Sequence, residues 1–214
     1  MTGGATRLVA IRHGETAWNA AQRLQGWQDI PLNALGRRQA ASLGAALAHE
    51  GLAAVVASDL QRAWQTGQAL ATALGLPLQA EPGLRERRFG HLEGLTHAEI
   101  EAQWPDEARR WRNREPGFTP AGGESLLDFQ ARCLAALERV AAAHAGQAVA
   151  LVCHGGVVDL LHRAATRVPL DLPRTWALGN AAINRLLHTP QGLSLVGWND
   201  TAHLGGLSDD DSTA

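Results

Sequence analysis

The feature that most constrains this chain is a short apolar run that is followed directly by charge. Residues 8–11 are Leu-Val-Ala-Ile, and Arg12, His13, Gly14 and Glu15 come next with no spacer. A strand without a polar side must be covered on both faces, which is typical of parallel sheets in α/β proteins. Arg12 and His13 then fall at the C-terminal end of the strand, where open α/β sheets bind ligands.

Two more apolar runs show the same arrangement. Residues 53–57 and 149–153 are short and apolar, and they are followed by Ser58 and by His154. Because the carboxyl ends of parallel strands meet at one edge of a sheet, we expect the groups after all three strands to lie close together. The sequence therefore predicts a ligand site at this edge.

The order of the elements predicts an α/β protein: a three-layer α/β/α sandwich with a mainly parallel central sheet and a small helical cap. A third short strand over residues 77–80 and an edge hairpin over 183–188 and 193–198 complete the predicted sheet. Neither a repeat nor a linker divides the chain. We expect a single domain over residues 1–204, with the cap at about 96–122 and a disordered acidic tail over 205–214.

Four stretches show apolar residues at helical spacing, and three of them begin at a capping signal. Asn33 is suited to cap the first of these helices. Ser58 with Gln61, and Ser125 with Asp128, have the spacing of a capping box and predict the starts of the second and third. The fourth follows His154 directly.

Composition excludes several classes of protein. All 19 basic residues are arginine and tyrosine is absent, so a Walker-type phosphate loop and a Schiff-base enzyme, which both need lysine, are excluded. A net charge of −2 with dispersed arginines argues against nucleic acid as a partner. No apolar run is long enough to span a membrane, and the N-terminus does not have the layout of a signal peptide, so we expect a cytoplasmic protein. Cys133 and Cys153 fit buried free thiols better than a disulfide.

The motif at the first strand has a known counterpart. The run Arg12-His13-Gly14-Glu15-Thr16-Ala17-Trp18-Asn19, together with the downstream His154-Gly155, resembles the signature of the histidine phosphatase (phosphoglycerate mutase-like) superfamily, in its phosphatase branch. The resemblance extends from about residue 7 to 204, and its parts occur in the family's order. It implies phosphoryl transfer through a phosphohistidine.

The residues present meet the needs of that chemistry, which are a nucleophile, cations for the phosphoryl oxygens and an acid for the leaving oxygen. The resemblance implies that His13 is the nucleophile, that Arg12 and Arg62 hold the oxygens, that His154 adds a donor, and that Glu86 is the proton donor. The remaining predicted substrate-binding residues are Asn19, Gln25, Gly26, Gly155 and Arg87.

Two of these assignments have alternatives within the sequence. Glu86 fits the family's Leu-x-Glu pattern before an aromatic-Gly pair, whereas Glu93 fits a structural turn whose carboxylate binds arginines locally. Arg62 lies in the first turn of its predicted helix, where a positive charge opposes the helix dipole unless an anion is near. The alternative is a solvated surface arginine.

Other chemistries fail on spacing. A cysteine phosphatase needs Cys-x5-Arg, but Asp159 occupies the position of that arginine after Cys153, and Leu160 follows it. No serine lies in Gly-x-Ser-x-Gly, which excludes the usual serine hydrolase. His91, Glu93 and His97 are a weak candidate for a metal site, and their being surface residues is the better explanation. A phosphate-binding domain without turnover is the non-enzymatic alternative, and the presence of Glu86 argues against it.

We therefore expect a phosphomonoesterase that acts on a small phosphorylated metabolite and needs no cofactor and no metal. A phosphoglycerate mutase is the alternative. Residues 87–121 form a short insertion rich in proline, glycine and charge, which favours an open site and hydrolysis. Against this, Arg87, Arg88 and the arginines between 109 and 114 are suited to bind a substrate carboxylate. A homodimer is left open.

Overall fold

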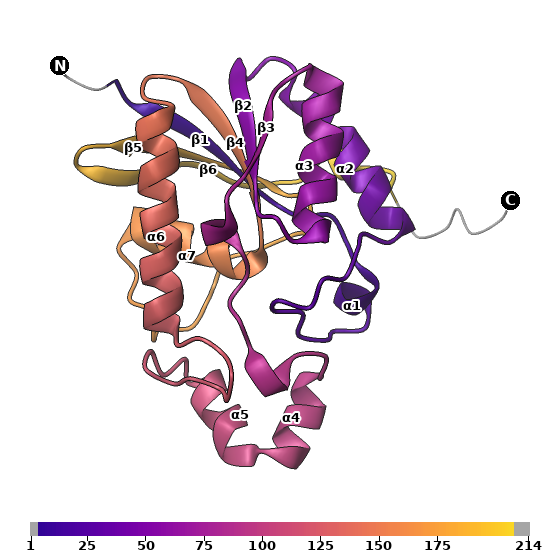
Figure 1. Cartoon of the computed structure of the whole chain (residues 1–214), viewed down its shortest axis with the longest axis vertical. Coiled ribbons are helices and arrows are strands. Elements are labelled where there is room, and N and C mark those ends of the chain that lie inside the picture. The colour runs from indigo at the N-terminus through magenta and orange to yellow at the C-terminus, as the bar shows by residue number, and fades with distance from the viewer. Residues whose placement is uncertain (1–3, 208–214) are drawn as a thin grey trace, which may run out of the picture.

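The computed structural model describes residues 4–207, and within them six strands form one sheet (Figure 1). The strand order is β3-β2-β4-β1-β5-β6. The pairs β3-β2, β2-β4 and β4-β1 are parallel, whereas β5 and β6 join antiparallel. In sheet order, the bounds are β3 Leu78–Ala80, β2 Leu52–Ala57, β4 Ala148–Cys153, β1 Thr6–Arg12, β5 Ile183–Thr189 and β6 Gly192–Asp200. The predicted hairpin at the sheet edge and the third short strand are confirmed.

Strand β4 shows why helices cover both faces of the sheet. All six of its residues are buried. Val149 and Leu151 pack with helices α6 (Leu126–Ala143) and α7 (Gly155–Thr166). The alternate residues, including Ala150 and Val152, pack on the other side with α2 (Ala34–Leu47) and α3 (Gln61–Leu74). Since a strand with two apolar sides needs a cover on each, the three-layer α/β/α sandwich follows, and the prediction of that fold is confirmed.

The helix starts follow the predicted caps at two of three positions. The Asn33 side chain accepts from Gly36 N, and the Ser125 side chain accepts from Asp128 N. The prediction for Ser58 is wrong, because α3 begins at Gln61 and Ser58 provides no cap for it. Asp29 Oδ1 instead accepts from Gln61 N at 2.6 Å. The carboxylate of Asp29, from another loop, therefore caps α3 in place of the predicted Ser58.

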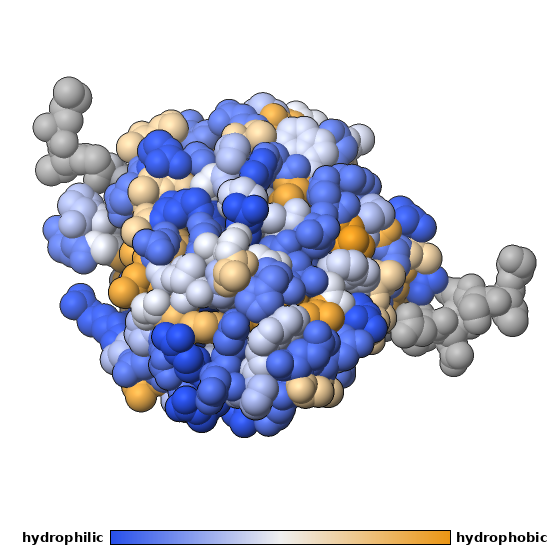
Figure 2. All heavy atoms as spheres, turned by 60° about the horizontal axis from the view of Figure 1, so that its bottom comes forward, coloured by the Kyte–Doolittle hydropathy of each residue, from blue (hydrophilic) through white to orange (hydrophobic). Residues whose placement is uncertain are grey.

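The region predicted as a cap contains two short helices, α4 (His97–Gln103) and α5 (Pro105–Arg112). Figure 1 shows them below the body of the molecule, beyond the end of the sheet that holds the site, with α1 (Ala17–Ala20) on the same side. Seen from that side, charged and polar side chains cover most of the surface, and apolar ones form scattered patches (Figure 2).

The predicted tail falls largely outside the described residues, which end at 207. Its three aspartates at 209–211 are therefore not placed. Among residues 4–207, no helix has both the length and the apolar character that crossing a bilayer requires.

Candidate active site

The ends of three neighbouring strands form the base of the site. His13 follows β1, Ser58 follows β2 and His154 follows β4, as the parallel arrangement predicts. Main-chain hydrogen bonds hold these ends together: His13 N donates to Cys153 O at 2.9 Å, and Ser58 N donates to Val152 O at 2.9 Å. The functional side chains therefore start from a backbone that the sheet itself positions.

A cavity of about 400 Å³, here called the His13 pocket, opens above these strand ends. Eight of the ten residues predicted for the site line it: Arg12, His13, Asn19, Gln25, Gly26, Arg62, Glu86 and Gly155. The other two, Arg87 and His154, lie outside this lining. The structure thus brings together side chains that are up to 143 positions apart in the case of Arg12 and Gly155.

His13 is held as a neutral imidazole with one free nitrogen lone pair. Its Nδ1 lies 2.7 Å from the Gly14 carbonyl oxygen, which can only accept, so the proton is on Nδ1 and Nε2 keeps a free lone pair. Burial, with the positive charges of Arg62 and Arg12, lowers the pKa of His13 well below 6.5. The ring is therefore neutral near pH 7. His13 follows the strand as expected, but it is 3% exposed and lies deeper than a residue on an open loop.

Arg12 and Arg62 bring two guanidinium groups to the pocket. Arg12 Nη1 donates to Leu178 O, and the two terminal nitrogens of Arg62 donate to Gln28 O and Gly26 O. In both residues Nε is buried without a partner. Arg62 is 1% exposed, and burial lowers its pKa to about 10, so it remains charged. The interpretation of Arg62 as a solvated surface residue is wrong.

His154 is fully buried behind this lining. Its ring centroid is 5.2 Å from that of His13, and its Nε2 lies 2.8 Å from Ser58 Oγ. Its Nδ1 is buried and has no partner. Burial and the positive charge of Arg62 lower the pKa of His154 well below 6.5. If the Ser58 hydroxyl donates to Nε2, the neutral ring carries its proton on Nδ1 and offers it as a donor.

Glu86 is fixed by two main-chain amides. Gly156 N donates to one carboxylate oxygen at 3.0 Å and Arg87 N donates to the other at 2.8 Å. A Cβ at Gly156 would lie 2.2 Å from Glu86 Oε1, so only glycine allows this close approach. Glu93 has a structural role, as expected, but its carboxylate accepts from Trp27 N and Phe89 N rather than from an arginine side chain.

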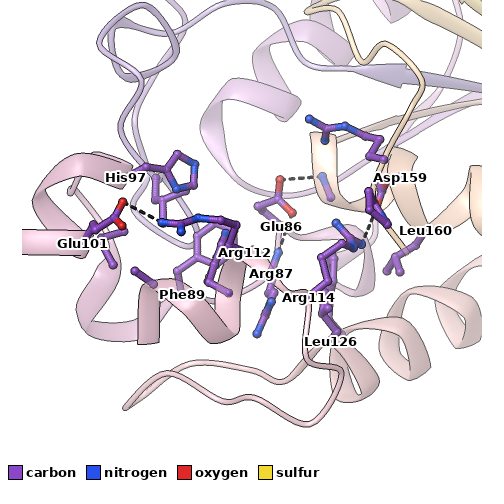
Figure 3. Close-up of a pocket in the computed structure, with 18 residues that line it drawn as sticks. Glu86, Arg87, Phe89, His97, Glu101, Arg112, Arg114, Leu126, Asp159 and Leu160 are labelled. Carbon is purple, nitrogen blue, oxygen red and sulfur yellow. Dashed lines mark hydrogen bonds and ion pairs between the residues drawn. The ribbon is translucent and has the colours of Figure 1, made fainter. Parts of the chain in front are cut away.

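A second cavity of about 630 Å³, here called the cap cavity, adjoins the His13 pocket at Glu86 and Gly156. Its walls come from α4, α5, α6 and α7 (Figure 3). Arg87 lines this cavity, but its Nε and Nη2 already donate to Glu124 O and Phe118 O. Its predicted role in substrate binding stays a prediction.

The loop before β5 contributes residues that the sequence did not indicate. Arg174 and Trp176 both line the His13 pocket, and Arg174 also lines the cap cavity. Ser58 was interpreted as a cap rather than as the partner of His154. Polarity and spacing give no signal for these positions, because the contacts arise only once distant segments meet.

The weak metal candidates are engaged in other contacts. His91 Nε2 lies 3.4 Å from Glu107 Oε2, and His97 lines both cavities. Between residues 4 and 207, no three histidine, cysteine, aspartate or glutamate side chains are close enough to bind a metal ion together. Cys133 and Cys153 are buried free thiols, and burial raises the pKa of Cys133 to about 12.

A sequence profile of the histidine phosphatase superfamily (branch 1) matches residues 8–201. The chain belongs to this superfamily. The predicted family and enzyme class, a histidine phosphatase, are confirmed.

Histidine phosphatases similar to this chain carry two kinds of name. The glucosyl-3-phosphoglycerate phosphatase of Mycolicibacterium vanbaalenii is 37% identical over 82% of this chain and 81% of its own length. Phosphoglycerate mutase-like protein 4 of Arabidopsis thaliana is 35% identical over 92% of this chain and 86% of its own length. The solved structure of Bacillus stearothermophilus YhfR has a TM-score of 0.87 and 32% identity, covering 93% of this chain and 99% of that one.

Proposed function

We propose that this protein is a phosphomonoesterase that hydrolyses small phosphorylated metabolites through a phosphohistidine on His13. The observation that carries the proposal is a set of buried nitrogens without partners beside a neutral imidazole: Arg12 Nε, Arg62 Nε and His154 Nδ1. Buried polar groups normally have partners, and three donors around one nucleophile are suited to the oxygens of a phosphate.

In the first step, the lone pair on His13 Nε2 attacks phosphorus, and the bond from phosphorus to the leaving oxygen breaks. Arg12 and Arg62 neutralise the charge that spreads over the phosphoryl oxygens. Glu86, in its protonated form, gives its proton to the leaving alcohol. Its two amide contacts keep the carboxyl group at the junction between the two cavities, where the leaving alcohol departs.

In the second step, water attacks phosphorus and loses a proton to the Glu86 carboxylate. The bond from phosphorus to Nε2 breaks, and its electron pair returns to the imidazole. Glu86 is thereby protonated again for the next substrate. The neighbouring cap cavity of about 630 Å³ supports hydrolysis, because it gives water a route to the phosphohistidine.

A phosphoglycerate mutase is the second candidate, favoured by the similarity to a mutase-like plant protein. A mutase must keep water away until the phosphoryl group returns to a second hydroxyl. We expect phosphate release from small phosphomonoesters and negligible interconversion of 2- and 3-phosphoglycerate, even with 2,3-bisphosphoglycerate added. Mutase turnover above hydrolysis in that coupled assay would favour the second candidate.

The finer parts of the proposal are that the enzyme needs no metal ion and that it acts in the cytoplasm. A mechanism made of His13, Glu86 and guanidinium groups uses no metal step, so a chelator should not change the rate. The two buried free thiols fit a reducing compartment. A homodimer stays a prediction, which gel filtration with light scattering would decide.

The test is His13→Ala. We expect turnover of p-nitrophenyl phosphate to fall on the order of 10⁴-fold or more, because no other group replaces the nucleophile. The unchanged protein should give a phosphoenzyme that is stable to base and labile to acid after rapid quenching. Phosphate trapped on Cys153 or on a serine would refute the proposed mechanism.

A further inference from the structure

Asp159 is a buried carboxylate that the proposed steps do not use. It is 4% exposed and lines the cap cavity. Its Oδ2 accepts from Arg114 Nη2 at 2.9 Å and from Arg163 Nε at 3.0 Å (Figure 3 draws the Arg114 pair). Its Oδ1 is buried and has no partner. Since an unpaired buried oxygen is costly, this atom calls for a donor that the chain itself does not supply.

Asp159 lies on the same face of α7 as the residue that holds Glu86. Gly156, which holds Glu86, and Asp159 lie three residues apart on α7 and therefore on one face of that helix. Three residues advance a helix by about 4.5 Å. Glu86, which is bonded to the Gly156 amide, and Asp159 both line the cap cavity, so an alcohol that reaches Glu86 with its leaving oxygen can present another hydroxyl to Asp159.

The other lining residues decide which donor fits. Arg112, Arg114 and Arg174 also line the cap cavity, so a positively charged amine would be repelled there. Phe89 and Trp111 belong to the same wall, and their apolar rings suit the C–H groups of a carbon skeleton. A neutral hydroxyl on a compact carbon skeleton satisfies Asp159 Oδ1 without that repulsion.

We propose that Asp159 is a specificity-determining residue, whose Oδ1 accepts a hydrogen bond from a hydroxyl of the leaving alcohol, so that the substrates are phosphate esters of polyhydroxylated alcohols such as sugars. The proposal rests on the proposed phosphomonoesterase function, because it assigns the alcohol side of the same site. The proposed contact to the alcohol is made by Asp159, about one helical turn after Gly156, whose amide holds Glu86.

The test compares two ligands of similar shape, glucose 6-phosphate and cyclohexylmethyl phosphate, which lacks the hydroxyls. Binding is measured by calorimetry in the His13→Ala background, so that turnover does not enter. We expect the hydroxylated ligand to bind about 10- to 100-fold more tightly, the range for a hydrogen bond to a charged group. Adding Asp159→Asn should reduce this preference about tenfold or more, because the amide oxygen stays with the arginines and the NH2 group replaces Oδ1.

Two control variants separate recognition from structure. Arg114→Gln breaks one ion pair of Asp159 but leaves Oδ1 in place, so the preference should persist. Asp106→Asn makes the same chemical change at a side chain that is 91% exposed on α5, and should keep the original preference.

Four outcomes would overturn the inference: no preference in the His13→Ala background, no binding of either ligand at millimolar concentration, equal weakening of both ligands by Asp159→Asn, or an Arg114→Gln effect as large as that of Asp159→Asn. Failure of the proposed phosphomonoesterase function would be recognised by a different result. The unchanged enzyme would then show neither turnover of p-nitrophenyl phosphate nor a phosphohistidine.

Discussion

The His13 pocket and the cap cavity meet at Glu86, but different parts of the chain build them. The His13 pocket starts from three strand ends joined by main-chain hydrogen bonds, and its key groups are almost fully buried. The cap cavity is bordered by short helices whose ion pair between Arg112 and Glu101 leaves side chains 63% and 59% exposed. Arg12, His13 and His154 therefore lie at strand ends, whereas most residues that line the cap cavity lie on helices.

This difference implies that substitutions in the two regions act on different quantities. Changes at the strand ends should lower the rate for every phosphate ester, because all of them present the same phosphoryl group. Changes around the cap cavity should alter the choice among esters or the stability of the cover. The following variants test that division, from the largest expected effect to the smallest.

Glu86→Gln tests the proposed proton donor, which lies where the His13 pocket and the cap cavity meet. We expect a loss of about 10²- to 10⁴-fold with alkyl phosphates, because an alkoxide leaves poorly without a proton. The loss with p-nitrophenyl phosphate should be much smaller, since its leaving group needs no acid. Steady-state rates on both substrates measure this difference. The matched variant Glu93→Gln should affect both substrates equally, and an equal loss for Glu86→Gln would mean that Glu86 is not the proton donor.

Ser58→Ala tests whether catalysis depends on the hydrogen bond between Ser58 and His154 behind the His13 pocket. Ser58 is fully buried, and its hydroxyl lies 2.8 Å from His154 Nε2. We expect kcat/KM to fall about tenfold for all esters, because a buried ring nitrogen loses its partner. Ser42→Ala removes a hydroxyl that bonds only within α2 at 2.8 Å and should leave kcat/KM unchanged. A change in substrate preference instead of a uniform loss would contradict the division between the regions.

Acid should weaken the folded protein through the two buried histidines. Burial lowers the pKa of both His13 and His154 well below 6.5. As the pH falls below about 6.5, the unfolded chain takes up protons that the folded chain excludes, so the free energy of unfolding falls by up to about 1.4 kcal/mol per pH unit for each group. Urea unfolding at pH 7.5, 6.5 and 5.5 measures the slope. His154→Gln should give a shallower slope, and equal slopes would refute this source of acid sensitivity.

Glu101→Gln tests how little the outer rim of the cap cavity contributes to stability. We expect the free energy of unfolding to change by less than about 0.5 kcal/mol, because exposed ion pairs are weak. The matched variant Glu124→Gln removes a bidentate contact with Arg132, at 2.8 Å for each oxygen, where the side chains are only 18% and 22% exposed. It should cost about 1–3 kcal/mol. Urea unfolding compares the two, and equal losses would contradict the contrast.

The sequence predicts the fold well because the hydrophobicity of each strand shows how many of its faces are buried. Continuous apolar runs required a cover on both faces, and β4 is buried at every position. The groups after those runs meet at one edge because parallel strands end together. Hence the positions of Arg12, His13 and His154 follow from local patterns, and Arg62 and Glu86 follow from the resemblance to the family.

The contacts that the sequence did not reveal join segments far apart along the chain. The spacing of Ser58 and Gln61 is correct for a capping box, yet Asp29 caps α3 and Ser58 bonds to His154. Asp159 entered the sequence argument only as a residue that breaks a cysteine phosphatase motif. Arg163 lies four residues away on the same helix, but Arg114 follows α5 far earlier in the chain, and no local pattern indicates that one oxygen of Asp159 stays unpaired.

Helix α7 fixes the spacing between the residue that holds Glu86 and the residue proposed to select the alcohol. Gly156 of this helix donates to the Glu86 carboxylate, and in the proposed mode of binding Asp159, three residues later, contacts the alcohol, so the helical repeat sets the spacing between the two contacts. Each added residue would rotate everything beyond it by about 100° and would turn Asp159 away from the cavity while His154 stayed in place. A change of preferred alcohol is therefore accessible through the identity of residue 159, whereas an insertion or deletion in the first turn of α7 would separate selection from catalysis.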